Sequence, residues 1–404
     1  MLNKIYKGIK TAFKYCVMYI SMLMPRSRHI CVFGAWLGER FADNSMQLFL
    51  EMQKHKNMRA VWITKNEETA KQIEELGYEV YMWGTFKAVW LHLRAKYAVV
   101  SNGISDLMHT FLGRAVIINL WHGIPLKKVC YDNKYEKNWD SPVQKFRDFL
   151  INIPLGNMYY VATSQVFTEI YQSAFRVRKE QVLCLGQPRS DIFFQKKKPA
   201  PYFPGKNIIL YCPTHRKEGN QKIEITKLFD LERLEIFLEE NGYYFIIKKH
   251  FYHRNEKEEL SSYPHIIDIT GMDMDIQRLV METKAMVTDY SSIYIDYLLL
   301  GMPLLFYCYD YEEYLAEDRE MYFPYEEVTP GIKARDFNGL LKELELFAIN
   351  GERYAKEERE RVKNLFYCKE AQGIVSGRLA DLIEKRGFGY KHIKEDHLKK
   401  YKRI

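Results

Sequence analysis

Short apolar runs alternate along the chain with amphipathic stretches. The apolar runs have the length of buried parallel strands, and the amphipathic stretches have the spacing of helices. This alternation predicts parallel sheets whose two faces are covered by helices. The predicted strands are 30–34, 59–64, 79–81, 97–101, 114–120, 159–163, 181–185, 207–211, 243–247, 266–267, 285–287 and 304–307. The predicted helices include 165–174, 230–240, 274–283, 335–350 and 353–387.

The clearest break in the pattern is residues 195–205, where three prolines, a glycine and a lysine run disfavour any helix or strand. We therefore predict an α/β protein with two Rossmann-like domains, residues 29–196 and 206–370, facing a cleft. An N-terminal helix (1–28) precedes them, and a C-terminal helix with a basic tail (371–404) follows. Ligands of such sheets bind beyond the carboxyl ends of the strands.

The first 28 residues carry only positive charge, because no acidic residue precedes Glu39. Apolar residues recur there at every third or fourth position, which is typical of an amphipathic helix. The apolar run 16–24 is too short to span a bilayer and lacks the cleavage site of a secretory signal. Either the helix lies on an anionic membrane surface, or it packs on its own domain; the unopposed charge favours the membrane.

The composition excludes several kinds of protein. With 404 residues, 47% of them hydrophobic, the chain can bury the cores of two domains. The net charge of +8 is not combined with a nucleic-acid-binding motif, so no nucleic-acid partner is predicted. Seven scattered cysteines without a CxxC pair indicate reduced thiols in a cytosolic protein. P-loop, GxGxxG and HExxH motifs are absent from the sequence, and no metal or cofactor is predicted.

The most informative stretch is residues 286–310, which is predicted to run strand, polar turn, helix, strand. Asp289, Ser291 and Ser292 lie in the turn, and each can cap the following helix. The N–H groups and hydroxyls of such a turn also suit a phosphate. The turn alone favours plain capping, and the rest of the chain shifts the balance towards a ligand.

Polar side chains follow four other predicted strands in the same way. These are His122 and Lys127 after 114–120, Arg189 after 181–185, Thr214 and Arg216 after 207–211, and His250 after 243–247. A single histidine usually satisfies a local hydrogen bond. Five clusters at equivalent strand ends instead supply cations, hydroxyls and imidazoles for one ligand. That inventory predicts a phosphorylated ligand and a proton transfer.

Together these motifs resemble the CDP-glycerol glycerophosphotransferase family of Gram-positive teichoic acid and capsule synthesis. The resemblance runs from about residue 33 to residue 382. Its motifs are 33–45, His122-Gly-Ile-Pro-Leu-Lys127, Gly186-Gln-Pro-Arg-Ser-Asp191, Pro213-Thr-His-Arg216, Asp289-Tyr-Ser-Ser-Ile-Tyr-Ile-Asp296, Phe306-Tyr-Cys-Tyr-Asp310 and Pro330-Gly331. The chain departs from the family at Phe251, where the family has a proline after the histidine. His253 then offers a second imidazole close to His250.

The resemblance implies a GT-B-like fold and transfer of glycerol phosphate from CDP-glycerol, with release of CMP. The implied acceptor is an undecaprenyl-linked glycan or polyol phosphate, reached from the cytoplasmic face of the membrane by a peripheral enzyme. His122 is the predicted base, and His250 is the second predicted catalytic residue. The predicted substrate-binding residues are Lys127, Arg189, Thr214, Arg216, Asp289, Ser291, Ser292 and Asp296.

Three alternatives stay open. CDP-ribitol is a close variant of the donor, and the motifs do not separate the two. A nucleotide-sugar glycosyltransferase of the same fold would have a similar set of cations. A non-enzymatic scaffold would be expected to have lost active-site residues, whereas His122, Arg216 and His250 are present.

Overall fold

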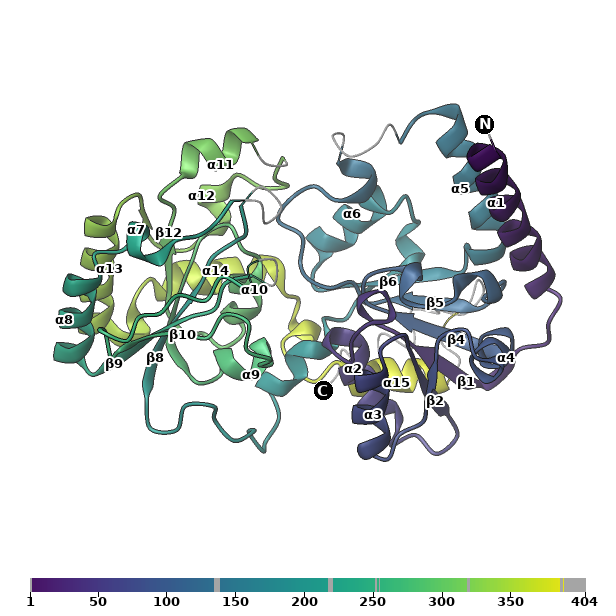
Figure 1. Ribbon diagram of the computed structural model, residues 1–404, viewed down its shortest axis with the longest axis horizontal. Coiled ribbons are helices and arrows are strands. Elements are labelled where there is room, and N and C mark those ends of the chain that lie inside the picture. Colours follow the sequence, from purple (N-terminus) through teal and green to yellow (C-terminus); the bar gives the residue numbers. More distant parts are fainter. Residues whose placement is uncertain are drawn as a thin grey trace. The chain divides into compact units, whose positions relative to one another are not determined.

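The computed structural model describes residues 2–133, 139–216, 221–250, 253, 255–317, 320–385 and 388. The chain forms two compact units, which are described separately (Figure 1). The first unit comprises Met1–His122, Cys130–Asp191 and Tyr367–Ile404, and the second comprises Gly123–Val129 and Ile192–Phe366. Each contains a parallel sheet, which confirms the predicted α/β class. Phe251 and the basic tail beyond residue 388 lie outside the described residues.

The first unit is built on a seven-stranded parallel sheet of order β3-β2-β1-β4-β5-β6-β7. Its strands are β1 Ser27–Phe33, β2 Arg59–Thr64, β3 Val80–Met82, β4 Ala95–Val100, β5 Val116–Asn119, β6 Met158–Ala162 and β7 Val182–Cys184. Its helices are α1 Leu2–Ser21, α2 Asp43–Met52, α3 Glu67–Glu75, α4 Phe86–Arg94, α5 Pro142–Leu155, α6 Gln165–Ala174 and α15 Ser376–Glu384. Val61, Val99 and Ile118 are fully buried, because helices cover both faces of the sheet.

The second unit is built on a six-stranded parallel sheet of order β10-β9-β8-β11-β12-β13. Its strands are β8 Asn207–Cys212, β9 Tyr243–Ile247, β10 Ile266–Asp268, β11 Thr283–Thr288, β12 Leu304–Tyr307 and β13 Lys333–Ala334. Its helices are α7 Ile225–Leu228, α8 Leu231–Asn241, α9 Ile276–Val280, α10 Ile293–Leu298, α11 Tyr311–Glu317, α12 Tyr325–Val328, α13 Phe337–Asn350 and α14 Lys356–Phe366. Helix α8 begins where Asp230 accepts from the Arg233 N–H and ends at Gly242, whose φ is 68°.

The helix predicted over 353–387 is wrong as a single element. It is divided into α14 and α15, and the chain returns to the first unit between Phe366 and Tyr367. Leu379 and Ile383 of α15 are fully buried in the core of the first unit. The charged pattern predicted helix correctly, but it did not reveal which core would bury the apolar face of the last turns.

Residues 123–129 also differ from the predicted domain boundaries, because they belong to the second unit rather than the first. The Tyr322 N–H donates to the Leu126 carbonyl at 2.8 Å, and the Lys128 N–H donates to the Glu320 carbonyl at 2.7 Å. A short antiparallel pairing therefore ties this segment to residues 320–322. Such a pairing between distant segments leaves no local pattern in the sequence.

Helix α1 packs on its own unit with one face. Met18 is buried, and the Tyr19 hydroxyl donates to the Leu150 carbonyl of α5 at 3.1 Å. Figure 1 shows α1, in purple, beside α5. No helix among the described residues is both long enough and apolar enough to cross a membrane.

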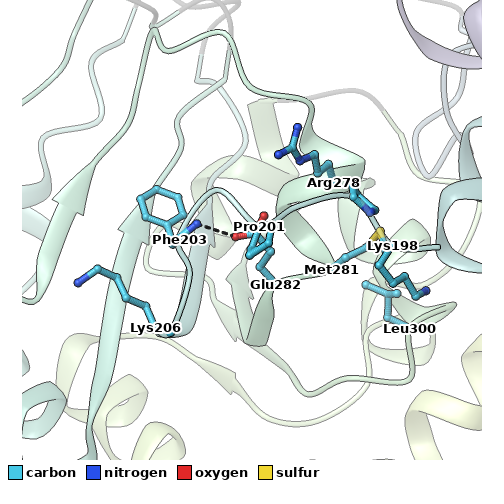
Figure 2. A pocket seen from close by; sticks show the side chains of 10 residues that line it. Lys198, Pro201, Phe203, Lys206, Arg278, Met281, Glu282 and Leu300 are labelled. Carbon is cyan, nitrogen blue, oxygen red and sulfur yellow. Dashed lines mark hydrogen bonds between the residues drawn. The ribbon is translucent and has the colours of Figure 1, made fainter.

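The proline-containing linker, predicted as irregular, is held by α9 and by the residues just after it. Arg278 of α9 donates from Nε to the Ala200 carbonyl at 2.9 Å. The Glu282 carboxylate accepts from the Tyr202 N–H at 2.6 Å and from the Phe203 N–H at 3.0 Å. A cavity of about 330 Å³ lies there, and Figure 2 shows Arg278 and Glu282 among the side chains that line it. None of the predicted site residues lines this cavity, so we treat it as a feature of the linker.

Candidate active site

In the second unit, three strand ends place an arginine between two aspartates. Arg216 follows β8, Asp289 follows β11 and Asp310 follows β12. The Arg216 Nε donates to Asp310 Oδ2 at 2.5 Å, and its Nη2 donates to Asp289 Oδ2 at 2.9 Å. The Arg216 side chain is only 5% exposed. The two carboxylates therefore hold the guanidinium in one position at the carboxyl edge of the sheet.

Thr214 belongs to the same network. Its N–H and its hydroxyl both donate to Asp289 Oδ1, at 2.8 and 2.6 Å, and its carbonyl accepts from Arg216 Nη1. Asp289 is fully buried. These bonds give Thr214, Arg216 and Asp289 a positioning role. Direct substrate contact by any of them stays a prediction.

The charge state of this network follows from its geometry. Burial alone would lower the pKa of Arg216, but Asp289 and Asp310 raise it, so the guanidinium stays charged. Its Cζ lies 5.3 Å from the centre of the Tyr290 ring and 5.0 Å from that of Tyr314. The two tyrosine rings stack on each other at 3.7 Å.

Lys127 lies in the segment 123–129 of the second unit and contacts the same cluster. Its ammonium group donates to the Tyr314 hydroxyl and lies 4.6 Å from the centre of that ring. The structure thus brings Lys127, Thr214, Arg216 and Asp289 together within the second unit. Asp310 and Tyr314 were missed as site residues, although Asp310 follows a predicted strand as the other cluster residues do.

Ser291 and Ser292 are half-buried in the turn before α10. Ser292 occupies the N-cap position, but its side chain makes no capping bond. Asp289 was also able to cap this helix by its position in the sequence, but its carboxylate binds Thr214 and Arg216 instead. Asp296 is buried on α10 and accepts from Gln277 of α9 at 3.2 Å, so it joins two helices.

The choice between His250 and His253 depends on their surroundings. His253 is fully buried, and its Nδ1 lies 2.9 Å from a Glu256 carboxylate oxygen. His250 is exposed, and its ring lies 4.7 Å from that of His215. Desolvation lowers the pKa of His250, and the charges of His253 and Lys127 add to this effect. His250 therefore stays the predicted ligand-binding imidazole, and its lowered pKa favours the neutral form at pH 7.

In the first unit, His122 follows β5 and is exposed. Arg189, which follows β7, donates from Nη1 to the His122 carbonyl at 2.8 Å. The same nitrogen lies 3.4 Å from Asp43 Oδ1. The Trp121 ring packs on the imidazole at 4.4 Å. Arg189 thus fixes the backbone at His122, a positioning role that the strand-end pattern alone did not specify.

Two residues around His122 have left-handed backbone conformations that are rare outside glycine. They are Asp43, with φ of 63°, and Trp121, with φ of 56°. Such conformations cost free energy and persist where the surrounding contacts enforce them. Asn44 provides such contacts, because it donates to the Trp121 carbonyl at 2.8 Å and accepts from the Arg189 N–H at 2.9 Å. Asp43 and Asn44 were predicted as members of the family motif 33–45 and not as site residues.

The electrostatics at His122 favour the neutral imidazole. Desolvation lowers its pKa most, the Asp43 carboxylate opposes this, and the Arg189 charge lowers it further. A neutral imidazole can accept a proton at pH 7, which is what a general base requires.

The described residues include one group of side chains that could hold a metal ion. His55, Asp381 and Glu384 place their ligand atoms within 4.8 Å of one another. The His55 Nδ1 already lies 2.8 Å from a Glu384 oxygen. These side chains are distinct from the two candidate clusters, and we assign them no role in the chemistry.

The chain is similar to curated proteins of teichoic acid synthesis. It is 26% identical over 380 residues to the teichoic acid glycerol-phosphate transferase of Staphylococcus aureus, an alignment that covers 89% of this chain and 94% of the relative. It is 25% identical over 398 residues to the teichoic acid ribitol-phosphate primase of Bacillus spizizenii, with 95% and 97% of the two chains covered.

Among solved structures, the wall teichoic acid polymerase TagF has the same fold. It superposes with a TM-score of 0.72 at 24% identity, covering 94% of this chain and 95% of the other. The GT-B-like fold that the motifs implied is thereby confirmed. The sequence model of CDP-glycerol:poly(glycerophosphate) glycerophosphotransferases matches residues 16–385. The chain therefore belongs to this family and is a glycerophosphotransferase-type enzyme.

Proposed function

We propose that this enzyme transfers glycerol phosphate from CDP-glycerol to a hydroxyl of a lipid-linked acceptor and releases CMP. The observation that carries the proposal is the Arg216 network, in which family motif residues from three strand ends bond to one another. The acceptor is an undecaprenyl-linked glycan or polyol phosphate at the cytoplasmic membrane surface. No metal takes part in the proposed steps.

In the proposed reaction, a primary hydroxyl of the acceptor attacks the β-phosphorus of CDP-glycerol. His122 accepts the hydroxyl proton as the new O–P bond forms. The bond between the β-phosphorus and the bridging oxygen breaks, and CMP leaves with that oxygen. The imidazolium then returns its proton to solvent. General-base assistance of this kind typically contributes about a hundredfold to ten-thousandfold.

The second unit binds the donor diphosphate in this proposal. His250 donates a hydrogen bond as a neutral imidazole, which is consistent with its lowered pKa. The Ser291 and Ser292 hydroxyls donate to phosphate oxygens. Both serines are half-buried, and the Ser292 side chain makes no capping bond. Lys127 supplies positive charge. These fixed donors stabilise the charge that develops on the leaving CMP.

CDP-ribitol is the second candidate donor, because the ribitol-phosphate primase aligns over nearly the whole chain. The test is to incubate the enzyme with a lipid-linked disaccharide acceptor and, separately, with CDP-glycerol, CDP-ribitol or a UDP-sugar. We expect CMP release with CDP-glycerol. Release with CDP-ribitol alone would support the second candidate, and UMP or UDP release alone would support a nucleotide-sugar glycosyltransferase.

We further propose that α1 and α5 form the membrane-binding face of the first unit. Exposed apolar side chains on α1 include Ile9 and Phe13, and those on α5 include Phe146, which is 61% exposed. Lysines and arginines are exposed among them, at Lys10, Lys14, Lys145 and Arg147. Apolar side chains flanked by cations favour binding to anionic bilayers.

The double substitution Phe13→Asp with Phe146→Asp should lower binding to anionic vesicles by about tenfold or more, because it removes apolar area and adds negative charge. Sedimentation with phosphatidylglycerol vesicles measures this binding. Ile349→Asp is the matched control, since Ile349 is 76% exposed on α13 of the second unit. Equal vesicle binding by the double variant and the wild type would rule out this face.

A further inference from the structure

Two cysteines far apart in the sequence meet in the first unit. Cys184 ends β7, and Cys368 lies just after the chain returns from the second unit at Tyr367. Their sulfur atoms are 3.2 Å apart, and the Cys184 thiol donates to the Cys368 sulfur. Both side chains are partly exposed. The spacing of the cysteines along the chain gave no sign of this pair.

We propose that Cys184 and Cys368 are a redox modification site, at which a low-molecular-weight disulfide oxidises the two thiols to an intrachain disulfide. A disulfide bond is about 2.05 Å long, so the sulfur atoms must approach by roughly 1 Å. Side-chain rotation can supply much of that approach. The other five cysteines are placed differently: Cys31, Cys212 and Cys308 are buried, Cys130 is partly exposed and Cys16 is exposed on α1.

The environment of the pair indicates which thiol reacts first. The hydrogen bond from Cys184 lowers the pKa of Cys368, and the Ala371 N–H lowers it further. The same bond raises the pKa of Cys184. Because the thiolate is the nucleophile, Cys368 is the attacking residue and Cys184 the resolving one.

The reaction proceeds by two exchanges. The Cys368 thiolate attacks one sulfur of the small disulfide, which forms a mixed disulfide and releases one small thiolate. Cys184 then loses its proton and attacks the Cys368 sulfur, which forms the protein disulfide and releases the second small thiolate. Two protein thiols are oxidised, and one small disulfide is reduced to two thiols.

The bond would reinforce a segment that non-covalent contacts already hold. The Cys368 N–H donates to the Thr163 carbonyl at 2.8 Å. Asp191, which follows β7, accepts from the Val375 and Ser376 N–H groups at 2.7 and 2.9 Å, at the start of α15. The disulfide would close a covalent loop that contains residues 192–366. It would therefore keep α15 attached to the first unit.

Incubating the full-length protein with excess glutathione disulfide, followed by tryptic peptide mapping, tests the proposal. We expect one peptide pair joined through Cys184 and Cys368, which dithiothreitol separates. Cys184→Ser and Cys368→Ser should each abolish the pair, and the control Cys16→Ser should leave it unchanged. Two freely alkylated cysteines after oxidation, or a major linkage to Cys16 or Cys130, would overturn the proposal.

A stability measurement on the wild type makes the test independent of the variants. All six tryptophans lie within residues 36–139, in the first unit. Oxidation should raise the midpoint of urea unfolding followed by tryptophan fluorescence, because the cross-link restricts the unfolded chain. Amide exchange in α15 should slow by about tenfold or more. An unchanged midpoint together with unchanged exchange would contradict the proposed effect on α15.

Discussion

His122→Ala is expected to lower turnover by about a hundredfold or more, because the acceptor hydroxyl loses its general base. Binding of CDP-glycerol should change little, since the proposal assigns donor binding to the second unit. Steady-state CMP release measures the first effect, and calorimetric titration measures the second. Near-normal turnover in a folded His122→Ala variant would remove His122 as the base.

A histidine elsewhere in the first unit provides the control. His29 is exposed on β1, and its Nδ1 lies 2.9 Å from the Asn57 carbonyl oxygen. His29→Ala should therefore keep wild-type turnover and the same unfolding transition. Comparing the two variants separates loss of an imidazole at the reaction centre from loss of any histidine in this unit.

The pH profile supplies a second readout for His122. Its pKa is lowered, mainly by desolvation, so the imidazole is neutral at pH 7 and becomes protonated only in acid. The profile of kcat/KM should be level through neutral pH and should fall below about pH 6.5, the ordinary histidine value. His122→Ala should lose that acidic limb. If the acidic limb of the kcat/KM profile is still present in His122→Ala, a group other than His122 causes it.

Arg216→Met is expected to destabilise the second unit by about 3–5 kcal/mol, because it leaves buried carboxylates without their cation. Asp289 is fully buried, and Asp310 is 14% exposed at its side chain. Donor binding should weaken as well, since Thr214 and Asp289 keep their positions through this network. Far-UV circular dichroism during urea unfolding should show an earlier transition for the variant.

Because all six tryptophans lie in the first unit, fluorescence and circular dichroism together distinguish unfolding of the two units. Tryptophan fluorescence reports the first unit, so its transition should move less than the circular dichroism transition in Arg216→Met. Adding Asp310→Asn should recover part of the loss, because it removes one of the two uncompensated charges. Arg233→Met is the control, since Arg233 is exposed and bonds Asn338 at 2.7 Å. A loss below about 1 kcal/mol in Arg216→Met would mean that the network is not a buried ion cluster.

The alternation of apolar and amphipathic stretches was enough to predict most helices and every strand of the two sheets except the two-residue edge strand β13. Helix α6 begins and ends where its pattern predicted, at Gln165 and Ala174. The pattern failed where contacts between distant segments determine which unit a segment belongs to. Tertiary contacts divided the predicted helix 353–387 between two cores, and pairing with residues 320–322 assigned 123–129 to the second unit.

The site residues likewise were predicted in part and missed in part. The strand-end rule correctly indicated that Thr214, Arg216 and Asp289 would lie near one another. It could not indicate that Thr214 and Arg216 both bond to Asp289, because that residue lies 75 and 73 positions further along the chain. The left-handed backbone at Trp121 was not predictable from the sequence, because bulky residues rarely adopt a positive φ; aspartate does so more often, but Asp43 had no local signal of it.

The most direct test of the proposed chemistry identifies both products of a single reaction with CDP-glycerol and a defined lipid-linked disaccharide. Mass spectrometry of the acceptor and chromatography of the nucleotide should show an added glycerol phosphate and an equal amount of CMP. Release of CDP with addition of glycerol alone would place the broken bond elsewhere. That result would contradict attack at the β-phosphorus, on which the assigned roles of His122 and the second unit depend.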